Sequence, residues 1–421
     1  MPSFWLAALA LLFQNDSPPK ANPKTELRAQ AAARKAAPKP ADKYLESIQL
    51  GADWLARQQL PDGPFRYGWI PALDRPLPGN HPLRQAGAAA ALAIVGREFN
   101  LPDHRKQAAL AATGMIAAWT EPDRKLPGAR RPSLSPTDAN PVGFTALLLW
   151  AASELAPSET ELVAPAEELA KFLVSRQRKD GTFNVANSYL DDGDDPPLNV
   201  AYYPGQALFA LLKSHRAKPA DWKLAAVRNA LPKYRQIWAD NPHEAMAPWL
   251  AAAATEFFFI TGDKPAGDFA LLLGDWSLAL QHREPKDKTL GWYGGFGSYH
   301  EGRLLATEPG ITSASFLEGI GDAYRVARQR EDRERMATYR AALDAGAEFL
   351  LSTQFTVGRT SHFNPAAAKR VRGGFWASLT DGALRIDQNQ HALRALSTYW
   401  LYGVAGLPPD GRGPRSELQA N

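Results

Sequence analysis

The chain has 421 residues, no cysteine and a formal net charge of +4, from 48 basic and 44 acidic residues. Its length allows one large core or two ordinary ones, and the lack of cysteine excludes disulfides, thiolate metal sites and cysteine nucleophiles. The positive excess lies between Asp16 and Lys43, where seven basic residues accompany three acidic ones and leave 41 of each elsewhere. Because the rest of the chain is neutral, we expect no nucleic acid partner.

The beginning of the chain predicts export. Residues 1–15 open with the apolar run MPSFWLAALALLF, which is too short to span a bilayer and suits a signal peptide. The alternative is an apolar start to the first helix. Residues 16–41 are rich in Pro, Ala and Lys and predict a flexible linker. No later segment has the length and apolarity of a transmembrane helix, so we expect a secreted, or periplasmic and envelope-associated, protein.

Residues 42–406 predict one all-α domain. Amphipathic segments such as DKYLESIQLGADWLARQQ (42–59) alternate with segments that are apolar nearly all round, such as PVGFTALLLWAASEL (141–155). A helix with a charged face lies at the surface, and one that is apolar on every side is buried. Six such alternations predict an (α/α)6 toroid, with six hairpins that form inner and outer rings of helices. Residues 407–421 predict a flexible C-terminal tail.

The inner helices have recognisable starts. Proline stands just inside five of them, where its missing N–H costs nothing; these are Pro82, Pro141, Pro204, Pro242 and Pro309. Asn140 and Asn241 are expected N-caps, and the pairs Asn241–Glu244 and Asp387–Gln390 have the spacing of a capping box. The connections that lead into inner helices are mostly long, so we expect long loops and inner N-termini at the same end. Those connections are 59–80, 122–139, 179–202, 283–308 and 355–386.

The ends of several outer helices carry a repeated phrase. It reads WLARQQLPDGPF, FLVSRQRKDGTF and, in a more divergent copy, FLLSTQFTVGRTSHF. A Gln followed by Gly and an aromatic residue resembles the QW-type repeat of squalene-cyclase and prenyltransferase-like α/α toroids. The resemblance implies the toroid fold, which is shared by terpenoid cyclases, six-hairpin glycosidases, polysaccharide lyases, sugar epimerases and non-catalytic binding domains.

Polar residues gather where the inner helices begin. Six helix N-termini that converge on one cavity favour acceptor-rich or anionic ligands. We expect Asp387 and Glu244 to be a general acid–base pair, with Glu308 and His391 as substitutes; helix capping is the alternative for Asp387 and Glu244. The residues expected to bind the substrate are Arg385, Gln390, Arg84, Gln85, Tyr202, Tyr203, Gln206, His243, Trp292 and His300.

The acidic loop YLDDGDDPPLN has three interpretations. Asp192, Asp194 and Asp195 match the D-x-D-D spelling of terpene cyclases, but the rest of that pattern is missing. Carboxylates so close together also suit Ca²⁺, or they are simply solvated. No other cofactor is implied, because the chain lacks the motifs of phosphate-binding loops, dinucleotide-binding folds and helical zinc sites.

These features predict an exported enzyme that acts on a poly- or oligosaccharide. A glycoside hydrolase, a polysaccharide lyase and a sugar epimerase all remain open, and the pair Arg84 and Arg385 favours a sugar that carries a uronate. The first alternative is a non-catalytic, envelope-associated toroid that binds a glycan or protein. The second is an enzyme like the terpenoid cyclases.

Overall fold

The computed structural model describes residues 42–135, 137–187, 195–300 and 302–411. Among the described residues, those from Tyr44 to Gly411 belong to one compact unit. The expected signal peptide, the whole of the expected linker and most of the expected tail lie outside the described residues, and the domain boundaries stay predictions. Among the described residues, no helix has the length and apolarity needed to cross a membrane.

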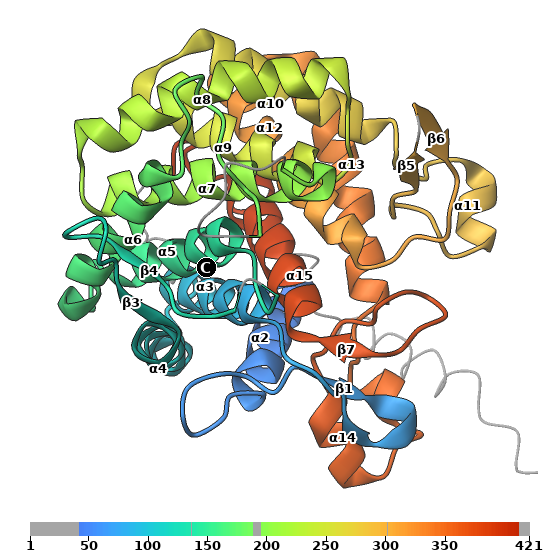
Figure 1. Ribbon diagram of the computed structural model, residues 1–421. Helices are drawn as coiled ribbons and strands as arrows, with labels where there is room; N and C mark the ends of the chain where they lie inside the picture. Colours follow the sequence, from blue (N-terminus) through green and yellow to red (C-terminus); the bar gives the residue numbers. More distant parts are fainter. Residues whose placement is uncertain (1–41, 136, 188–194, 301, 412–421) are drawn as a thin grey trace, which may run out of the picture. The chain divides into compact units, whose positions relative to one another are not determined.

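Six helices form a closed inner ring (Figure 1). Each contacts the next along the chain, and the last contacts the first. They are α3 (Pro82–Glu98), α5 (Pro141–Leu155), α7 (Pro197–Ala217), α9 (Met246–Thr261), α12 (Thr312–Gln329) and α15 (Ile386–Thr398), which continues as the π-helical turn η4 (Tyr399–Val404).

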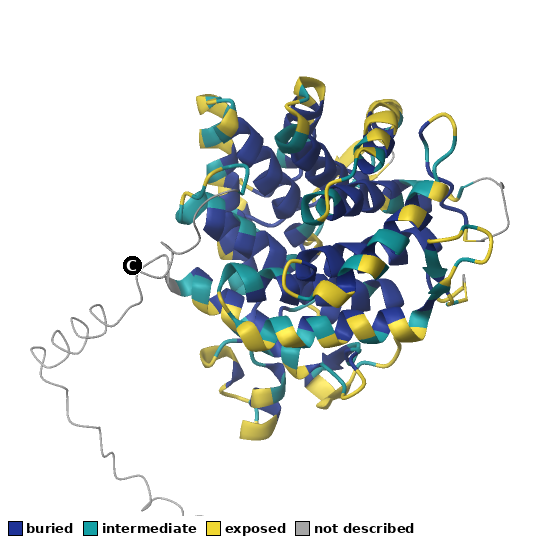
Figure 2. Ribbon diagram, turned by 90° about the vertical axis from the view of Figure 1, so that its left-hand side faces the viewer, coloured by how far each residue is buried: buried dark blue, intermediate teal, exposed yellow. Residues whose placement is uncertain are grey.

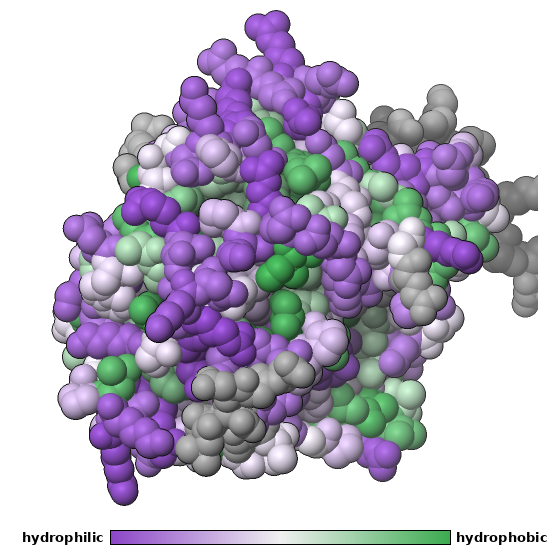
Figure 3. Space-filling view, turned by 45° about the horizontal axis from the view of Figure 1, so that its top comes forward, coloured by the Kyte–Doolittle hydropathy of each residue, from purple (hydrophilic) through white to green (hydrophobic). Residues whose placement is uncertain are grey.

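Six outer helices precede the inner ones along the chain and surround them. They are α2 (Asp42–Arg57), α4 (Pro102–Trp119), α6 (Val163–Ser175), α8 (Asp221–Asp240), α10 (Lys264–Leu278) and α13 (Arg333–Ser352). Every residue of α5 is buried, whereas outer helices expose a polar face to solvent (Figure 2). Hydrophilic side chains cover most of the surface seen in Figure 3. The predicted (α/α)6 toroid is confirmed.

The loops between the rings hold the short elements. β1 (Gly68–Ile70) pairs antiparallel with both β2 (Arg75–Pro76) and β7 (Leu384–Arg385), which joins the first loop to the last. The others are β3 (Thr120–Pro122) with β4 (Arg130–Pro132), β5 (Ser298–His300) with β6 (Arg303–Leu305), the turns η1 (Pro71–Leu73), η2 (Thr160–Leu162) and η3 (Gly358–Thr360), and the short helices α11 (Pro285–Thr289) and α14 (Pro365–Val371).

A repeated glutamine link ties neighbouring outer helices together. At the end of an outer helix, a Gln amide donates to the carbonyl of a loop glycine and to a carbonyl of another outer helix. That glycine has a positive φ, and its Cα lies against a carbonyl of the same second helix, so a side chain there meets both strain and a clash. The four Gln–Gly pairs are Gln59–Gly63, Gln177–Gly181, Gln281–Gly294 and Gln354–Gly373.

The structure corrects the sequence phrase in two respects. The third copy is completed by Gly373 and Phe375, after a long insertion, and not by Gly358 and Phe363. A fourth copy, which begins at Gln281, was not expected from the sequence. In both copies, extra residues between the Gln and the Gly change the spacing of the phrase in the sequence. The hydrogen bond from the Gln amide to the Gly carbonyl is kept.

Two expected helix starts are wrong. α7 begins at Pro197, so Pro204 lies inside the helix, and α9 begins only at Met246. Asn140 does cap α5, since its side chain accepts from two backbone N–H groups. Asn241 caps nothing in this way, and α9 has Ala245 at its N-cap. The expected Asn241–Glu244 capping box is therefore absent, and the Glu244 carboxylate is left for another contact.

Candidate active site

All six inner helices contribute to one cavity of about 380 Å³. The contributing residues lie in the N-terminal halves of their helices, as the convergence of helix starts requires. One lining residue from each helix is Leu83 on α3, Leu147 on α5, Tyr202 on α7, Trp249 on α9, Thr312 on α12 and Asp387 on α15.

A smaller chamber of about 130 Å³ adjoins this cavity. The two share the lining residues Tyr202, Trp249, Thr312, Ser315 and His391. These shared residues stand between the two spaces, so a ligand of more than one unit can occupy both.

His391 is the titratable side chain at the junction of the two chambers. Its Nδ1 lies 2.8 Å from Oε1 of Glu318, whose side chain is only 1% exposed. Glu318 is paired with Arg394, and an ionised carboxylate only accepts hydrogen bonds. The proton of neutral His391 therefore lies on Nδ1, and Nε2 presents its lone pair on the side away from Glu318.

The floor beneath His391 is a buried chain of charges. Arg394 lies among the rings of Trp150, Phe209 and Trp249, with its guanidinium carbon 4.8–5.5 Å from their centroids. It also donates to Asp322 at 3.0 Å. With Glu318 and Asp322 as partners, this buried cation is paired, as burial requires, and it fixes the position of the carboxylate that holds His391.

The charge chain continues away from the cavity. Arg325 binds both Asp322 at 3.0 Å and Glu256 at 3.1 Å. Burial alone would raise the pKa of Glu256, but Arg216 and Arg325 outweigh it and hold the pKa well below its usual range. Glu256 therefore remains ionised, and the chain is a charge-balanced support for the cavity floor.

Asp387 lies on the wall that α15 shares with α3. Its carboxylate is 3.1 Å from Arg84 Nε and 3.2 Å from Arg385 Nε. It does not cap α15: the backbone N–H of Arg385 donates to the Gln388 side chain instead. The expected Asp387–Gln390 capping box is thus wrong, and Asp387 instead bridges the two arginines and offsets one of their two positive charges.

His81 places a second imidazole on the same cavity, at the N-cap of α3. Burial lowers its pKa, although the nearby Asp387 opposes that shift. Nδ1 of His81, Oε1 of Gln206 and Nε2 of Gln390 are buried and have no partner among the described residues. Unpaired buried polar atoms are costly, so these groups suit a ligand that both donates and accepts hydrogen bonds.

Small residues on neighbouring helices make room for the site's side chains. A side chain at Gly87 of α3 would meet the amide of Gln390, and one at Gly143 of α5 would meet the ring of Tyr203. A Cβ on Gly205 of α7 would lie 2.7 Å from Cβ of Trp249. These contacts fix the cavity wall through packing at the helix crossings.

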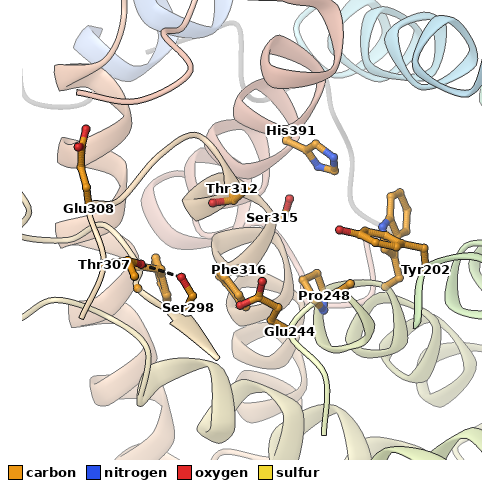
Figure 4. Close-up of a pocket in the computed structure, with 14 residues that line it drawn as sticks. Tyr202, Glu244, Pro248, Ser298, Thr307, Glu308, Thr312, Ser315, Phe316 and His391 are labelled. Atoms are coloured by element: carbon orange, nitrogen blue, oxygen red, sulfur yellow. Dashed lines mark hydrogen bonds between the residues drawn. The ribbon is translucent and has the colours of Figure 1, made fainter. Parts of the chain in front are cut away.

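Glu244 and Glu308 both line the smaller chamber. Oε2 of Glu244 accepts from the backbone N–H of Tyr299 at 2.7 Å. Glu308 accepts from the N–H and hydroxyl of Thr380, each at 3.0 Å. Figure 4 shows Glu308 on the opposite side of the view from His391 and Tyr202, with Glu244 between them. Glu244 is therefore the better placed of the two carboxylates to reach a ligand beside His391.

The structure brings some expected residues to the cavity and leaves others elsewhere. Arg385, Gln390, Arg84, Tyr202, Tyr203, Gln206 and His391 line it together with Asp387. Gln85, His243, Trp292 and His300 line neither chamber.

The residues outside the chambers have local partners. Gln85 binds the backbone of Phe65. Nδ1 of His243 accepts from the N–H of Ala245, and Trp292 packs beside His282. These contacts hold the loops in place and do not involve the cavity.

The acidic loop is only partly described. Asp192 and Asp194 lie outside the described residues. Asp195 is 2.6 Å from Arg178 and accepts from the N–H of Val185 at 2.8 Å. Among the described residues, no group of three or more His, Asp or Glu side chains could hold a metal ion. Calcium at this loop stays a prediction.

Sequence reasoning missed Glu318 and Trp249. The signal for Glu318 was present: Glu318, Asp322 and Arg325 recur at helical spacing on one side of an otherwise buried helix. Charges at that spacing on an inner helix point to a partner inside the ring.

Comparison with known proteins shows the fold. No family model matches the chain, and no curated protein does. A cellobiose 2-epimerase from Bacillus thermoamylovorans B4167 superposes with a TM-score of 0.60 at 11% identity, over 85% of this chain and 98% of that one. A D-mannose isomerase gives 0.61 at 12% identity, over 91% and 99%. An unsaturated glucuronyl hydrolase from Bacillus sp. GL1 gives 0.60 at 16%, over 88% and 100%.

The chain thus has the six-hairpin (α/α)6 toroid fold of these sugar-processing enzymes. At such identities the likeness concerns the fold alone. The squalene-cyclase type of repeat stays a prediction.

Proposed function

We propose that this protein is a carbohydrate-active enzyme that moves protons on a sugar, as an epimerase or isomerase does. The observation that carries the proposal is the pair His391–Glu318. A buried carboxylate fixes the imidazole so that its basic nitrogen is left for a ligand at the junction of two chambers. General bases in proteins are held in this way.

The proposed reaction uses groups that line the cavity. His391 Nε2 removes the proton from the carbon next to the carbonyl of an open-chain reducing sugar, which leaves an enediolate. The N–H groups of Arg84 and Arg385 stabilise its negative charge. Return of a proton to the opposite face of the same carbon gives the epimer. Return to the former carbonyl carbon, with the proton of the C2 hydroxyl passed to the C1 oxygen, gives the ketose. His81, whose pKa is lowered by burial, is the second proton carrier.

The arrangement of carboxylates supports this choice over hydrolysis. Hydrolysis of a glycoside needs one carboxyl group as acid and a second as base or nucleophile. Asp387 is bound to two arginines, and Glu308 is bound to Thr380. Two toroids of the same fold carry the names cellobiose 2-epimerase and D-mannose isomerase, which agrees with the proposal.

The test is proton exchange with solvent. Neutral and uronate-bearing reducing sugars are incubated with the protein in D₂O, and deuterium at C2 and new sugars are followed by NMR. We expect His391→Asn to lower the exchange rate by roughly 10²–10⁴-fold, the usual contribution of a general base. Glu318→Gln should lower the rate too, and should also change the pH profile, because it removes the group that fixes the imidazole tautomer.

Two results would contradict the proposal. One is cleavage of glycosides without deuterium uptake that depends on Asp387 and Glu244, which would favour the hydrolase. The other is sugar binding without any turnover, unchanged in His391→Asn, which would favour the non-catalytic toroid. Arg84 and Arg385 carry two positive charges against the one negative charge of Asp387, so we also expect a preference for sugars that carry a uronate, and the same panel of sugars tests it.

A further inference from the structure

A second cavity, of about 330 Å³, lies outside the active-site chambers. It is formed by the end of α2, the loop that contains β1, and α14. Its lining residues are Arg57, Gln58, Arg66, Trp69, Ala366, Lys369 and Arg370. Four of the seven are cations and none is acidic. We call this set the basic cavity.

Two of the four cations in the basic cavity, Arg66 and Lys369, have no ion-pair partner among the described residues. Arg370 pairs with Asp74, with 2.9 Å between Nε and Oδ1. Arg57 donates to the backbone carbonyl of Arg372. Gathered cations repel one another, and an anion placed among them relieves that repulsion.

Trp69 orients two of the cations. The guanidinium carbons of Arg66 and Arg370 lie 5.7 and 5.6 Å from the centroid of its ring, within cation–π range. With guanidinium groups held against it, this ring is not an open platform for stacking a nucleobase. Outside residues 16–43 the sequence carries 41 basic and 41 acidic residues, and this balance does not favour nucleic acid, which needs a basic face. The arrangement suits compact oxyanions such as carboxylate and sulfate.

One buried polar atom indicates that the ligand carries a hydrogen-bond donor as well as an anionic group. Gln58 is 3% exposed and lines the cavity, and its Oε1 has no partner among the described residues. This oxygen can only accept a hydrogen bond, and four cations offer only donors. A ligand that satisfies both carries an anionic group and a hydroxyl.

The basic cavity is joined to the active-site cavity through one antiparallel pairing. Trp69 of β1 lies opposite Leu384 of β7, and Gly68 lies opposite Arg385. Arg385 lines the active-site cavity. Figure 1 shows β1, β7 and α14 gathered at one side of the ring.

From this geometry we propose that the basic cavity binds an acidic sugar unit of an oligosaccharide, through a carboxylate or sulfate and a neighbouring hydroxyl. The inference rests on the proposed function in one respect, that the ligand is a sugar chain. It adds a specificity site outside the two active-site chambers.

The experiment measures binding by titration calorimetry at low and high salt. The probes are a short oligogalacturonate, its methyl-esterified neutral form, a sulfated oligosaccharide, a single-stranded oligonucleotide, and inorganic sulfate and phosphate alone. The test variant is Arg66→Gln with Lys369→Gln. The matched control is Arg124→Gln with Lys125→Gln, which removes the same charge from two exposed residues elsewhere.

We expect the acidic oligosaccharides to bind at least tenfold more weakly to the test variant and within twofold of wild type to the control. The neutral ester should bind weakly to all three proteins, and Gln58→Leu should weaken the oligosaccharide more than sulfate. Equal binding to the test variant, equal weakening in the control, or tighter binding of a single-stranded oligonucleotide would each overturn the proposal. If proton exchange fails while this binding pattern holds, the proposed function falls and the binding site stands; the reverse pattern removes only the binding site.

Discussion

Replacement of Gln354 by Leu tests whether the glutamine links hold the ring closed. Gln354 lies two residues after the end of α13 and reaches the first outer helix, α2. Its amide donates to the carbonyls of Ser47 at 2.9 Å and Gly373 at 3.0 Å, and its Oε1 accepts from the Ser47 hydroxyl at 2.7 Å. Gln354 is 1% exposed. Leucine fills a similar volume and removes all three bonds.

The expected cost follows from those bonds. A buried hydrogen bond contributes about 1 kcal/mol net, and a partner left without one costs about 1–3 kcal/mol. Three bonds, with two stranded carbonyls, give a loss of about 3–5 kcal/mol in the free energy of unfolding. The matched control is Gln59→Leu, which removes the same kind of link between α2 and α4. Gln59 is only half-buried, so water replaces its bonds and the expected loss is about 1–2 kcal/mol.

Equilibrium urea denaturation, followed by circular dichroism, measures both losses. The slope of free energy against urea should be unchanged, because the buried surface is the same. If Gln354→Leu costs no more than Gln59→Leu, the links at buried positions do not close the ring, and packing alone holds it.

The remaining predictions concern a glycine and a buried carboxylate. Gly294→Ala should lower the free energy of unfolding by more than about 3 kcal/mol, because φ is +89° and the new methyl group would meet the carbonyl of Ala345. Gly302→Ala is the control, since its φ is +77° and open space surrounds it. It should cost only about 1 kcal/mol in the same urea assay. Burial would raise the pKa of Glu154, but its two cationic partners, Arg97 among them, outweigh it and hold the pKa at about 2. The stability that this depressed pKa contributes is present above pH 4.5, the ordinary pKa, and is lost as pH falls towards 2. Glu154→Gln should therefore make the free energy of unfolding depend less on pH between these values. An unchanged pH profile would contradict the ion pairing.

The sequence predicted the toroid because the signal is spread over the whole chain. An inner helix such as α9 is apolar all round, and outer ones such as α13 keep charged residues, so each hairpin repeats the same information. The positions at which the helices begin were less predictable. Pro242 and Pro204 each looked like a helix start, but a proline marks a start only when packing agrees. Tyr203 lies against Gly143 of α5, and Gly205 lies against Trp249 of α9, so α7 is packed on both sides of Pro204.

The chemistry of the site was less visible, because it depends on partners far apart in the chain. His391 and Glu318 are separated by 73 residues, and no local spacing announces their contact. Asp387 and Glu244 attracted attention as carboxylates near helix starts, yet their roles are set by Arg84 and by the N–H of Tyr299. Local reasoning identifies where polar groups lie, but their partners decide which of them remain available to a ligand.

Closure of the ring and assembly of the active site are one event in this architecture. His81 and Arg84 come from α3, the first inner helix, and Asp387 and His391 come from α15, the last. They share a cavity only because α15 contacts α3, a contact in which Gly87 leaves room for Gln390 and β1 pairs with β7. A chain that lacked either end hairpin would keep most of its core contacts but lose one side of the proposed proton-transfer site. The contacts that close the ring therefore support function directly. A substitution that weakens them should reduce activity before it lowers the stability of the core.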